Sequence, residues 1–377
     1  MRILIDARFT RTDQHDGISR YGASLIEAVA KRADVAMLVS DERQLALLPA
    51  VPHVLVSSPL SPAELFIAAR VNRLAPDVVF CPMQTMGTWG RRYPLILTLH
   101  DLIYYVHPQP PGFLPAPVRL LWRLYHMAYW PQRLLLDRAD VVATVSHTTE
   151  ALMAGKRLTR RPVRIVGNAP QPGRAPRASD GGAERMLVYM GSFMPYKNVE
   201  TAIAGMRDLP EYELHLLSRI SLARRAELEA LAPAGARLVF HNGVSEAEYE
   251  GLLLRATALV SLSRSEGYGL PLVEAMSLGT PVIASDIPIF REVGGTGTAL
   301  VDPDSPAEFA AAVRALEAPG AWETASRAAL ARAGEFSWDR SAEALLAAAE
   351  DARAEFASRG RRRPGWLGRL GRGAGDR

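Results

Sequence analysis

The stretch that decides the fold is EGYGLPLVE, residues 266–274. It follows an apolar run, Ala258–Leu262, whose composition predicts a buried strand. Gly267 and Gly269 let the backbone approach a ligand closely, and Pro271 suits the first turn of a helix. The stretch therefore predicts a strand, a glycine-containing loop and a helix whose N-terminal amides can hold an anion.

The two carboxylates of this stretch, Glu266 and Glu274, are expected in the loop and in the first helical turn. They can contact different parts of one ligand, about one nucleoside length apart. A plainer interpretation makes Glu274 a partner of the helix dipole and Glu266 a solvated loop acid. The glycines and the proline between them favour the ligand-binding interpretation.

Outward from this stretch, short apolar runs alternate with segments of helical period. Before residue 170 the predicted strands are Arg2–Asp6, Val35–Ser40, Val78–Cys81, Leu95–His100, Val141–Ser146 and Val163–Val166, with helices at Ile18–Lys31, Pro62–Leu74 and Thr148–Ala154. After residue 185 they are Met186–Gly191, Glu213–Leu217, Leu238–His241, Ala258–Leu262 and Val282–Ser285, with helices at Asn198–Met206, Leu222–Leu231, Glu246–Ala256, Pro306–Leu316, Trp322–Ala333 and Arg340–Phe356. Nearly continuous apolar strands separated by helices predict parallel sheets covered on both faces.

The alternation pauses at residues 171–185, which are rich in Pro, Gly and Ala and predict a linker. It separates two doubly wound α/β domains, residues 1–170 and 186–339. A last helix at 340–357 and a basic tail at 358–377, expected to be disordered, complete the chain. Two such sheets normally face each other across a cleft, and ligands bind at the carboxyl ends of their strands.

The positive charge of the chain is concentrated at its C-terminal end. The 377 residues carry a net charge of +4, and residues 359–377 hold seven Arg against one Asp, so the preceding chain sums to −2. A nearly neutral body argues against nucleic-acid binding, which would place positive charge on the fold itself. The single cysteine, Cys81, excludes an intramolecular disulfide framework and a Cys-rich zinc site.

The chain resembles glycosyltransferase family 4, retaining enzymes of the GT-B fold, and the nonapeptide is the E-x7-E signature of that family. The resemblance also includes DAR at 6–8, GISRY at 17–21, HD at 100–101, YMGS at 189–192, PYKN at 195–198, EAMSLGTPV at 274–282 and FSW at 336–338. The GISRY and Lys-Asn pieces are most similar to bacterial mannosyltransferases that build surface polysaccharides.

This resemblance implies two Rossmann-like domains facing across a cleft, with the last helix crossing back to the N-terminal one. It implies transfer of a hexose with retention, without cofactor or metal, and suggests mannose from GDP-mannose as the donor. The acceptor it suggests is a glycan or a polyprenyl-linked oligosaccharide. A UDP-glucose or UDP-galactose donor is the alternative, and a non-catalytic nucleotide-sugar-binding protein is a further one.

The resemblance also assigns roles to residues of the predicted cleft. Donor binding falls to Gly17, Ser192, Lys197, Asn198, Glu266, Gly267, Tyr268, Gly269, Leu270 and Glu274. Catalysis falls to His100, Lys197 and Glu266. Lys197 would bind the diphosphate, Glu266 a sugar hydroxyl and Glu274 the ribose. His100 would lie beside the reacting carbon and donate to a hydroxyl or to the leaving oxygen.

Two positions depart from the family pattern or allow a second interpretation. Ser192 stands where many relatives carry an Arg as a second phosphate cation. Phosphate neutralisation then rests either on Lys197 with the helix N-terminus, or on Arg264 or Arg219 as a substitute. Gly17 is either a flexible contact to the diphosphate or a plain turn before the helix at Ile18.

Two short patterns suggest other chemistry but are better explained by local structure. The D-P-D at 302–304 resembles a metal-binding D-x-D, yet it precedes a capping box at Ser305/Glu308 and is expected to be a turn. A second capping box, Ser245/Glu248, predicts another helix start. The first strand is not followed by G-x-G-x-x-G, which disfavours a hydride-transfer enzyme.

The sequence suggests a cytoplasmic protein that associates peripherally with the membrane. Neither a signal peptide nor a spanning segment is evident. Residues 119–138 combine Arg with Trp122, Tyr125, Tyr129 and Trp130, which suits either a membrane interface or a core-facing helix broken at Pro131. The tail, Arg359–Arg377, either binds anionic lipid headgroups or only keeps the chain soluble.

Overall fold

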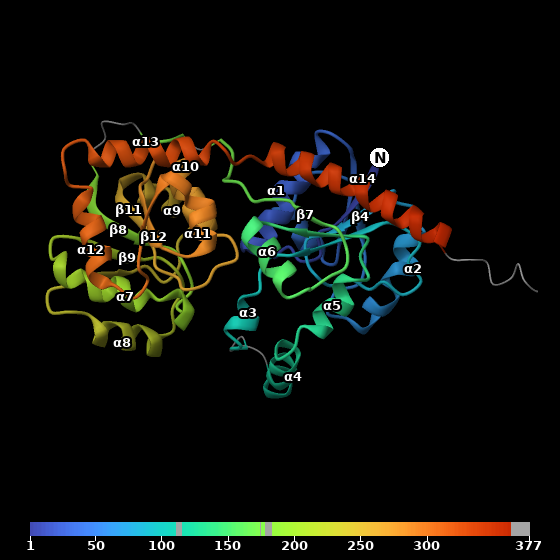
Figure 1. Cartoon of the computed structure of the whole chain (residues 1–377), viewed down its shortest axis with the longest axis horizontal. Coiled ribbons are helices and arrows are strands. Elements are labelled where there is room, and N and C mark those ends of the chain that lie inside the picture. Colours follow the sequence, from blue (N-terminus) through green and yellow to red (C-terminus); the bar gives the residue numbers. More distant parts are fainter. Residues whose placement is uncertain (111–114, 174, 178–182, 363–377) are drawn as a thin grey trace, which may run out of the picture.

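The computed structural model describes residues 1–110, 115–173, 175–177 and 183–362, which form two α/β lobes side by side (Figure 1). Each lobe is built on one parallel sheet, with seven strands in the N-terminal lobe and six in the C-terminal lobe. Helices pack on the sheets, and the apolar side chains between them form the core of each lobe. The predicted α/β class with two doubly wound parallel sheets is confirmed.

The N-terminal sheet has the strand order β3-β2-β1-β4-β5-β6-β7. Its strands are β1 (Arg2–Asp6), β2 (Asp34–Val39), β3 (His53–Leu55), β4 (Val78–Cys81), β5 (Leu95–Leu99), β6 (Val141–Thr144) and β7 (Val163–Ile165). Between them lie α1 (Gly17–Ala30), η1 (Glu42–Leu47), η2 (Pro62–Phe66), α2 (Ile67–Asn72), α3 (Ile103–Val106), α4 (Ala116–His126), α5 (Trp130–Leu136) and α6 (His147–Gly155). The order changes direction at β1 and β4, so ligands are expected beside the carboxyl ends of these strands.

The C-terminal sheet has the order β10-β9-β8-β11-β12-β13. Its strands are β8 (Glu184–Tyr189), β9 (Glu213–Leu216), β10 (Arg237–Phe240), β11 (Ala256–Ser261), β12 (Val282–Ser285) and β13 (Thr298–Val301). The helices are η3 (Pro195–Lys197), α7 (Val199–Gly205), η4 (Met206–Asp208), α8 (Leu222–Leu231), α9 (Glu246–Arg255), α10 (Leu270–Ser277), α11 (Pro288–Gly294), η5 (Gly295–Gly297), α12 (Pro306–Ala315), α13 (Ala321–Ala333) and α14 (Trp338–Arg362).

The predicted strands begin and end within two residues of the observed ones, but β3 and β13 were not predicted. Both lie at sheet edges and are partly exposed, so they lack the continuous apolar run of a central strand. The single helix predicted at Pro62–Leu74 is wrong: it divides into η2 and α2 at Phe66, whose φ of −109° and ψ of 3° interrupt the helix.

One of the two predicted capping boxes is complete. At Ser245 the hydroxyl accepts from the Glu248 amide and the Glu248 carboxylate accepts from the Ser245 amide. At Ser305 only the first bond forms, because the Glu308 carboxylate accepts instead from the amide of Asp302, at 2.9 Å. The turn at 302–304 thus takes the place of the second half of the box.

The last helix, α14, joins the two lobes along one side of the molecule (Figure 1). At its start Trp338 donates its indole N–H to the carbonyl of Pro170, at 3.0 Å. Near its end Arg359 forms an ion pair with Asp140 of the N-terminal lobe, at 3.0 Å. The helix therefore crosses from the C-terminal lobe to the N-terminal sheet.

Two expected boundaries shift in the structure. The strand β8 takes residues 184 and 185 from the expected linker, and α14 takes residues 358–362 from the expected disordered tail. Residues 363–377, which hold most of the tail, lie outside the described residues.

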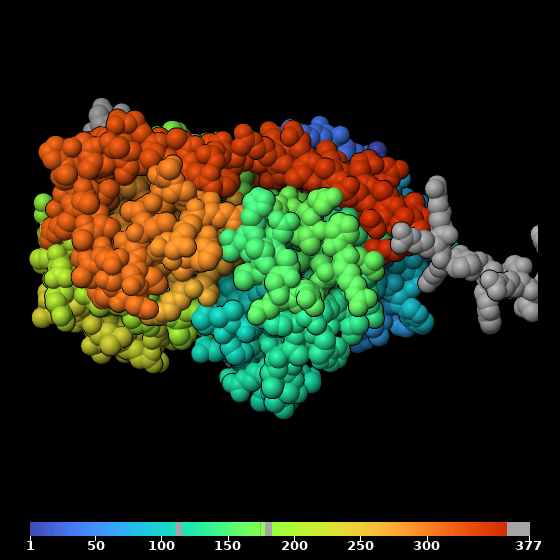
Figure 2. All heavy atoms as spheres, in the orientation of Figure 1, coloured from blue at the N-terminus to red at the C-terminus, as the bar shows by residue number. Residues whose placement is uncertain are grey.

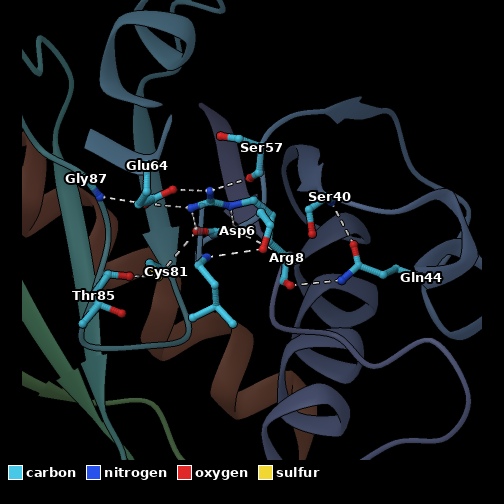
Figure 3. A network of polar contacts seen from close by, with 11 residues as sticks. Asp6, Arg8, Ser40, Gln44, Ser57, Glu64, Cys81, Thr85 and Gly87 are labelled. Atoms are coloured by element: carbon cyan, nitrogen blue, oxygen red, sulfur yellow. Dashed lines mark hydrogen bonds and ion pairs between the residues drawn. The ribbon is translucent and has the colours of Figure 1, made fainter. Parts of the chain in front are cut away.

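A buried ionic network fixes the carboxyl end of β1 (Figure 3). Arg8 pairs with Asp6 at 2.7 Å and with Glu64 of η2 at 2.5 Å, and the side chains of Arg8 and Asp6 are fully buried. The Glu64 carboxylate also accepts from the amide of Gly87 at 2.8 Å. Position 87 requires glycine, because a Cβ there would lie 1.9 Å from the backbone carbonyl oxygen of Glu64. Burial raises the pKa of the neighbouring Cys81 thiol, so this cysteine is a neutral core residue.

Candidate active site

The glycine-containing loop after β11 leads into α10 as predicted, and its helix start faces α1. Gly269 is the N-cap of α10 with φ of 96°, and a Cβ there would lie 2.8 Å from the Phe290 ring, so the position requires glycine. Gly17 is the first residue of α1, where a Cβ would lie 3.6 Å from the Leu270 side chain. Two helix N-termini from different lobes therefore meet, and their amides can hold an anion.

Lys197 and Glu266 form an ion pair at the same edge of the C-terminal sheet. The Lys197 ammonium lies 2.6 Å from the Glu266 carboxylate, which also accepts from the Ser263 hydroxyl at 2.8 Å. Both side chains are mostly buried, at 17% and 13% exposed. This pair places a cation and a hydrogen-bond acceptor within reach of one ligand.

Asn198 holds the Lys197 turn in place. Its backbone adopts the left-handed conformation, with φ of 55°, which asparagine tolerates better than most residues. Its side-chain amide donates to the carbonyls of Leu262 and Pro303, at 2.9 and 2.7 Å, and its oxygen accepts from Thr201 at 2.9 Å. The side chain is therefore used within the lobe, and it positions the lysine.

Glu274 lies in α10 and meets an arginine from the opposite lobe. Arg20 of α1 bonds the Glu274 carboxylate at 2.8 Å and the Glu246 carboxylate at 2.5 Å. The Glu274 side chain is 7% exposed and that of Arg20 is 17% exposed. Because the two residues come from different lobes, the pair links the lobes at the predicted ribose site. An ion pair this well buried is less screened by salt than a surface pair.

His100 follows the end of β5, at the edge where the two lobes meet. Its Nε2 lies 2.7 Å from the Pro82 carbonyl, which can only accept, so this nitrogen carries the proton. The ring of Tyr21 packs edge-on at 5.1 Å between centroids. In the neutral ring Nδ1 is then an acceptor. Donation from His100 to a sugar hydroxyl or to the leaving oxygen stays a prediction.

Burial lowers the pKa of His100 below its ordinary value, so the neutral form dominates at pH 7. We therefore expect kcat/KM to stay level as the pH falls from 8 to about 6.5, the ordinary histidine pKa, and to decline only at lower pH. A pH–rate profile compared with that of His100→Asn measures this. A decline of kcat/KM centred above pH 6.5 that is absent from the variant would contradict the neutral form assigned to His100.

Asp101 and His107 bring the segment around α3 against the C-terminal lobe. A Cβ at Gly267 would lie 2.8 Å from the Asp101 carboxylate, and burial raises the pKa of this carboxyl group. His107 hydrogen-bonds the Ser265 hydroxyl at 2.8 Å and stacks on Tyr196 at 5.2 Å between centroids. The loop that precedes α10 is thus covered by the opposite lobe.

Gly267→Ala is expected to lower kcat/KM about tenfold, because the new methyl group would separate Asp101 from the loop and misplace the reacting groups. The matched control is Gly251→Ala in α9, where a Cβ would meet nothing within 4 Å. Steady-state kinetics with thermal unfolding of both variants tests this. Equal activity of the two variants would show that the close approach is not needed.

Further contacts between the lobes lie beside the cleft. Glu292 of α11 accepts from the amides of His147 and Thr148, both at 2.7 Å, and so caps α6 of the opposite lobe. Tyr268 donates its hydroxyl to the Asn168 carbonyl at 2.8 Å, so its side chain reaches the connection between the lobes.

The site residues that the sequence analysis missed are Arg20, His107 and Glu292. Arg20 lies within the GISRY motif, which was the available signal for it. His107 and Glu292 belong to no recognised motif.

The second phosphate cation is not found where it was expected. Ser192 is exposed, and Arg264 pairs with Asp304 at 2.5 Å. Arg219 packs on Gly243, where a Cβ would lie 3.1 Å from its Cγ. Arg20, in contrast, reaches a predicted donor-binding residue from across the cleft.

The D-P-D at 302–304 forms the predicted turn, in which the Asp302 carboxylate accepts from the Asp304 amide at 2.8 Å. Within the ranges that the structure describes, no three His, Cys, Asp or Glu side chains are grouped as metal ligands would be. In the same ranges, no helix is both long and apolar enough to cross a membrane.

Comparison with known families agrees with this geometry. Residues 15–171 match the model of Glycosyltransferase Family 4, and residues 177–335 match the model of Glycosyl transferases group 1. A glycosyltransferase with two Rossmann-like lobes is therefore the class that fold and family models define. The chain belongs to the glycosyltransferases, with a Glycosyltransferase Family 4 domain followed by a Glycosyl transferases group 1 domain, which together cover most of its length.

Several relatives carry specific names. The chain is 23% identical to the O-antigen chain mannosyltransferase RfbU of Salmonella typhimurium, over 80% of this chain and 87% of RfbU. It is 30% identical to a D-inositol 3-phosphate glycosyltransferase of Acidothermus cellulolyticus, over 60% and 57% of the two chains. It is also 30% identical to the O-antigen chain mannosyltransferase B of Escherichia coli, over 40% and 42%.

Solved structures show the same fold. A sucrose-phosphate synthase from Thermosynechococcus elongatus superimposes with a TM-score of 0.70 at 20% identity, covering 95% of this chain and 99% of its own. Anabaena HepE in complex with UDP-glucose superimposes with a TM-score of 0.64 at 17% identity, covering 95% and 100%. These neighbours confirm the GT-B architecture.

Proposed function

We propose that this chain is a retaining, metal-independent hexosyltransferase that moves mannose from GDP-mannose to a glycan or a polyprenyl-linked acceptor in surface-polysaccharide synthesis. The observation that carries the proposal is the Lys197–Glu266 pair beside two facing helix N-termini. The names of the two O-antigen mannosyltransferases support mannose as the sugar. The HepE complex with UDP-glucose supports the alternative, a UDP-glucose or UDP-galactose donor.

In this proposal the chain acts chiefly by positioning the donor and stabilising its leaving group. Lys197 and the amides of Gly269 and Leu270 neutralise the diphosphate. Glu266 accepts from a hydroxyl of the donor sugar, and Glu274 accepts from the ribose. The backbone of Gly17 and that of the loop at 267–269 approach the phosphates closely.

Retention is proposed to proceed by attack on the same face from which the diphosphate leaves. A covalent intermediate would need an ionised carboxylate at the reacting carbon. Asp101 is the acid beside His100, and burial raises its pKa while its Oδ1 accepts from the Ile103 amide at 2.9 Å. One oxygen of this carboxyl group is thus already bonded within its own loop, which supports attack without a covalent intermediate. Proton NMR of the product's anomeric configuration tests retention.

Isothermal titration calorimetry against GDP, UDP and their sugars decides the donor. Tighter binding of GDP-mannose than of UDP-glucose and UDP-galactose, together with turnover, is the expected result. Tighter binding of a UDP-sugar would replace the donor assignment. Nucleotide-sugar binding without hydrolysis or transfer to any glycan acceptor would favour the non-catalytic alternative.

Turnover is expected to persist in excess chelator, because a lysine and a helix N-terminus would take the part that a divalent cation plays in D-x-D enzymes. Initial rates with and without EDTA measure this. The proposal of metal independence is wrong if EDTA abolishes turnover and manganese or magnesium restores it.

We further propose that the enzyme works at the cytoplasmic face of the cell membrane as a peripheral protein. The six Arg of residues 361–377 support this, since each basic residue near an anionic surface contributes about 1 kcal/mol. The seventh, Arg359, pairs with Asp140 of the N-terminal lobe. Deletion of residues 363–377 is expected to lower the fraction of the protein that sediments with anionic vesicles at low salt.

A further inference from the structure

An exposed apolar surface of the N-terminal lobe lies on α4 and α5, which project from it (Figure 1, Figure 2). No residue of α4 is buried. The apolar face, as we name it, consists of Val118, Leu120, Leu121, Leu124, Met127, Trp130 and Leu134, which are 43% to 77% exposed. In the part of the C-terminal lobe that the structure describes, the only apolar side chains of this size and exposure are Leu222 and Leu231 on α8.

The opposite side of α4 is fixed by aromatic packing. Trp122 meets Tyr104 edge-on at 5.0 Å between centroids, and His126 meets Tyr105 at 5.0 Å. Tyr105 also stacks on Tyr129 at 4.6 Å. These aromatic side chains thus pack on α3 and on one another, while Trp130 and the aliphatic side chains of the apolar face are exposed.

The charge around the apolar face has one sign. No Asp or Glu occurs from position 102 to position 136, and Arg119 and Arg123 are exposed on α4. Arg133 of α5 donates to the carbonyls of Lys156 and Arg157, which brings two further basic residues beside the helix. Exposed aliphatic side chains among cations are the pattern of a helix that lies on anionic lipid.

We propose that the apolar face of α4 and α5 seats this protein on a bilayer that carries anionic headgroups. The charge favours this occupant over a second copy of the chain. In a two-fold pair the arginines of one α4 would approach those of the other, without a carboxylate in the segment to compensate them. On a bilayer, in contrast, the leucine side chains enter the interface and the arginine side chains contact the lipid phosphates.

The seat would hold the reaction cleft close to the membrane. The helix α3 touches α4 through Tyr104, and shortly after α3 His107 bonds Ser265 beside the Lys197–Glu266 pair. A lipid-linked acceptor in the bilayer would then reach the cleft past α3. This last step rests on the proposed transfer reaction, and the seat itself deepens the peripheral membrane association proposed above by naming the surface that makes it.

Vesicle sedimentation of the full chain tests the proposal. The probes are phosphatidylcholine vesicles with and without phosphatidylglycerol, at low and high salt. Leu120→Ser/Leu121→Ser/Leu124→Ser is expected to lower the partition coefficient at least about tenfold on mixed vesicles, because three aliphatic side chains no longer enter the interface. Arg119→Gln/Arg123→Gln is expected to lower it about 10- to 30-fold at low salt and far less at high salt.

The matched control is Leu222→Ser/Leu231→Ser, which removes exposed leucines of the other lobe and should bind vesicles like the unchanged chain. Deletion of residues 363–377 should leave a vesicle-bound fraction that the three serines then abolish. Calorimetry with GDP shows whether each variant keeps its nucleotide site. A triple-serine variant that sediments like the unchanged chain overturns the proposal. A dimer in vesicle-free buffer that the three serines convert to a monomer overturns it in favour of self-association.

Discussion

Lys197→Met is expected to lower kcat for donor hydrolysis about 10²- to 10³-fold, because it removes a preorganised cation from the leaving diphosphate. The ammonium is held 2.6 Å from Glu266, and its turn is locked by the buried Asn198. It therefore needs little rearrangement to meet the charge that develops as the sugar bond breaks. Initial rates at saturating donor, with circular dichroism of each variant, measure the effect.

A second variant separates this catalytic part from a structural one. Removing the lysine alone leaves the Glu266 carboxylate, 13% exposed, without its ammonium partner. In Lys197→Met/Glu266→Gln that charge is also removed, and Glu266→Gln alone measures the loss that belongs to the glutamate. If the lysine only neutralised the glutamate, the double variant would be as active as Glu266→Gln. We expect it to be far less active than Glu266→Gln. Lys31→Met, at a lysine that is 62% exposed on the surface, should keep full activity.

The parts of the fold that could be predicted are those fixed by local chemistry. The central strands are continuous apolar runs, and the start of α10 is set by Gly269 and Pro271. The edge strands β3 and β13 were not predicted because their partly exposed residues carry no such run. The division between η2 and α2 was not predicted because the helical period of the sequence continues through Phe66.

The candidate site divides in the same way. Its C-terminal part could be proposed from local sequence, because Lys197 lies in the turn after β8 and Glu266 in the loop after β11. Glu274 lies in α10 but is its fifth residue, so the prediction that placed it in the first helical turn is wrong. The N-terminal part of the site could not be proposed in this way, because it depends on how two lobes meet. Arg20 and Glu274 are 254 positions apart, and no local pattern states that they will form an ion pair.

The contacts between the lobes are directed at the donor-binding elements themselves. Asp101 lies against Gly267, His107 bonds Ser265 and Arg20 bonds Glu274. The contacts that join the lobes are therefore also contacts of the residues predicted to bind the donor, so any movement of the lobes would change both together. A nucleotide that enters must share Glu274 with Arg20, and this gives the ribose site a second test.

Glu274→Ala is expected to weaken binding of bare GDP or UDP about 10- to 150-fold, because the ribose loses a charged hydrogen bond worth about 1.5–3 kcal/mol. Glu266→Ala should leave bare-nucleotide affinity nearly unchanged and lower the transfer rate by a similar factor, since its carboxylate is assigned to the sugar. Calorimetry with the nucleotide alone and kinetics with the full donor separate the two effects.

Glu246→Ala is the matched control for the loss of Glu274. It removes the other carboxylate of Arg20, which is 59% exposed, and keeps the 2.8 Å contact between Arg20 and Glu274. If Glu274 acts on the ribose, this control binds nucleotide like the unchanged chain. If Glu274 only holds the lobes together through Arg20, Arg20→Ala should weaken bare-nucleotide binding as much as Glu274→Ala does. Equal losses in Glu266→Ala and Glu274→Ala would show instead that the two carboxylates do not divide sugar from ribose.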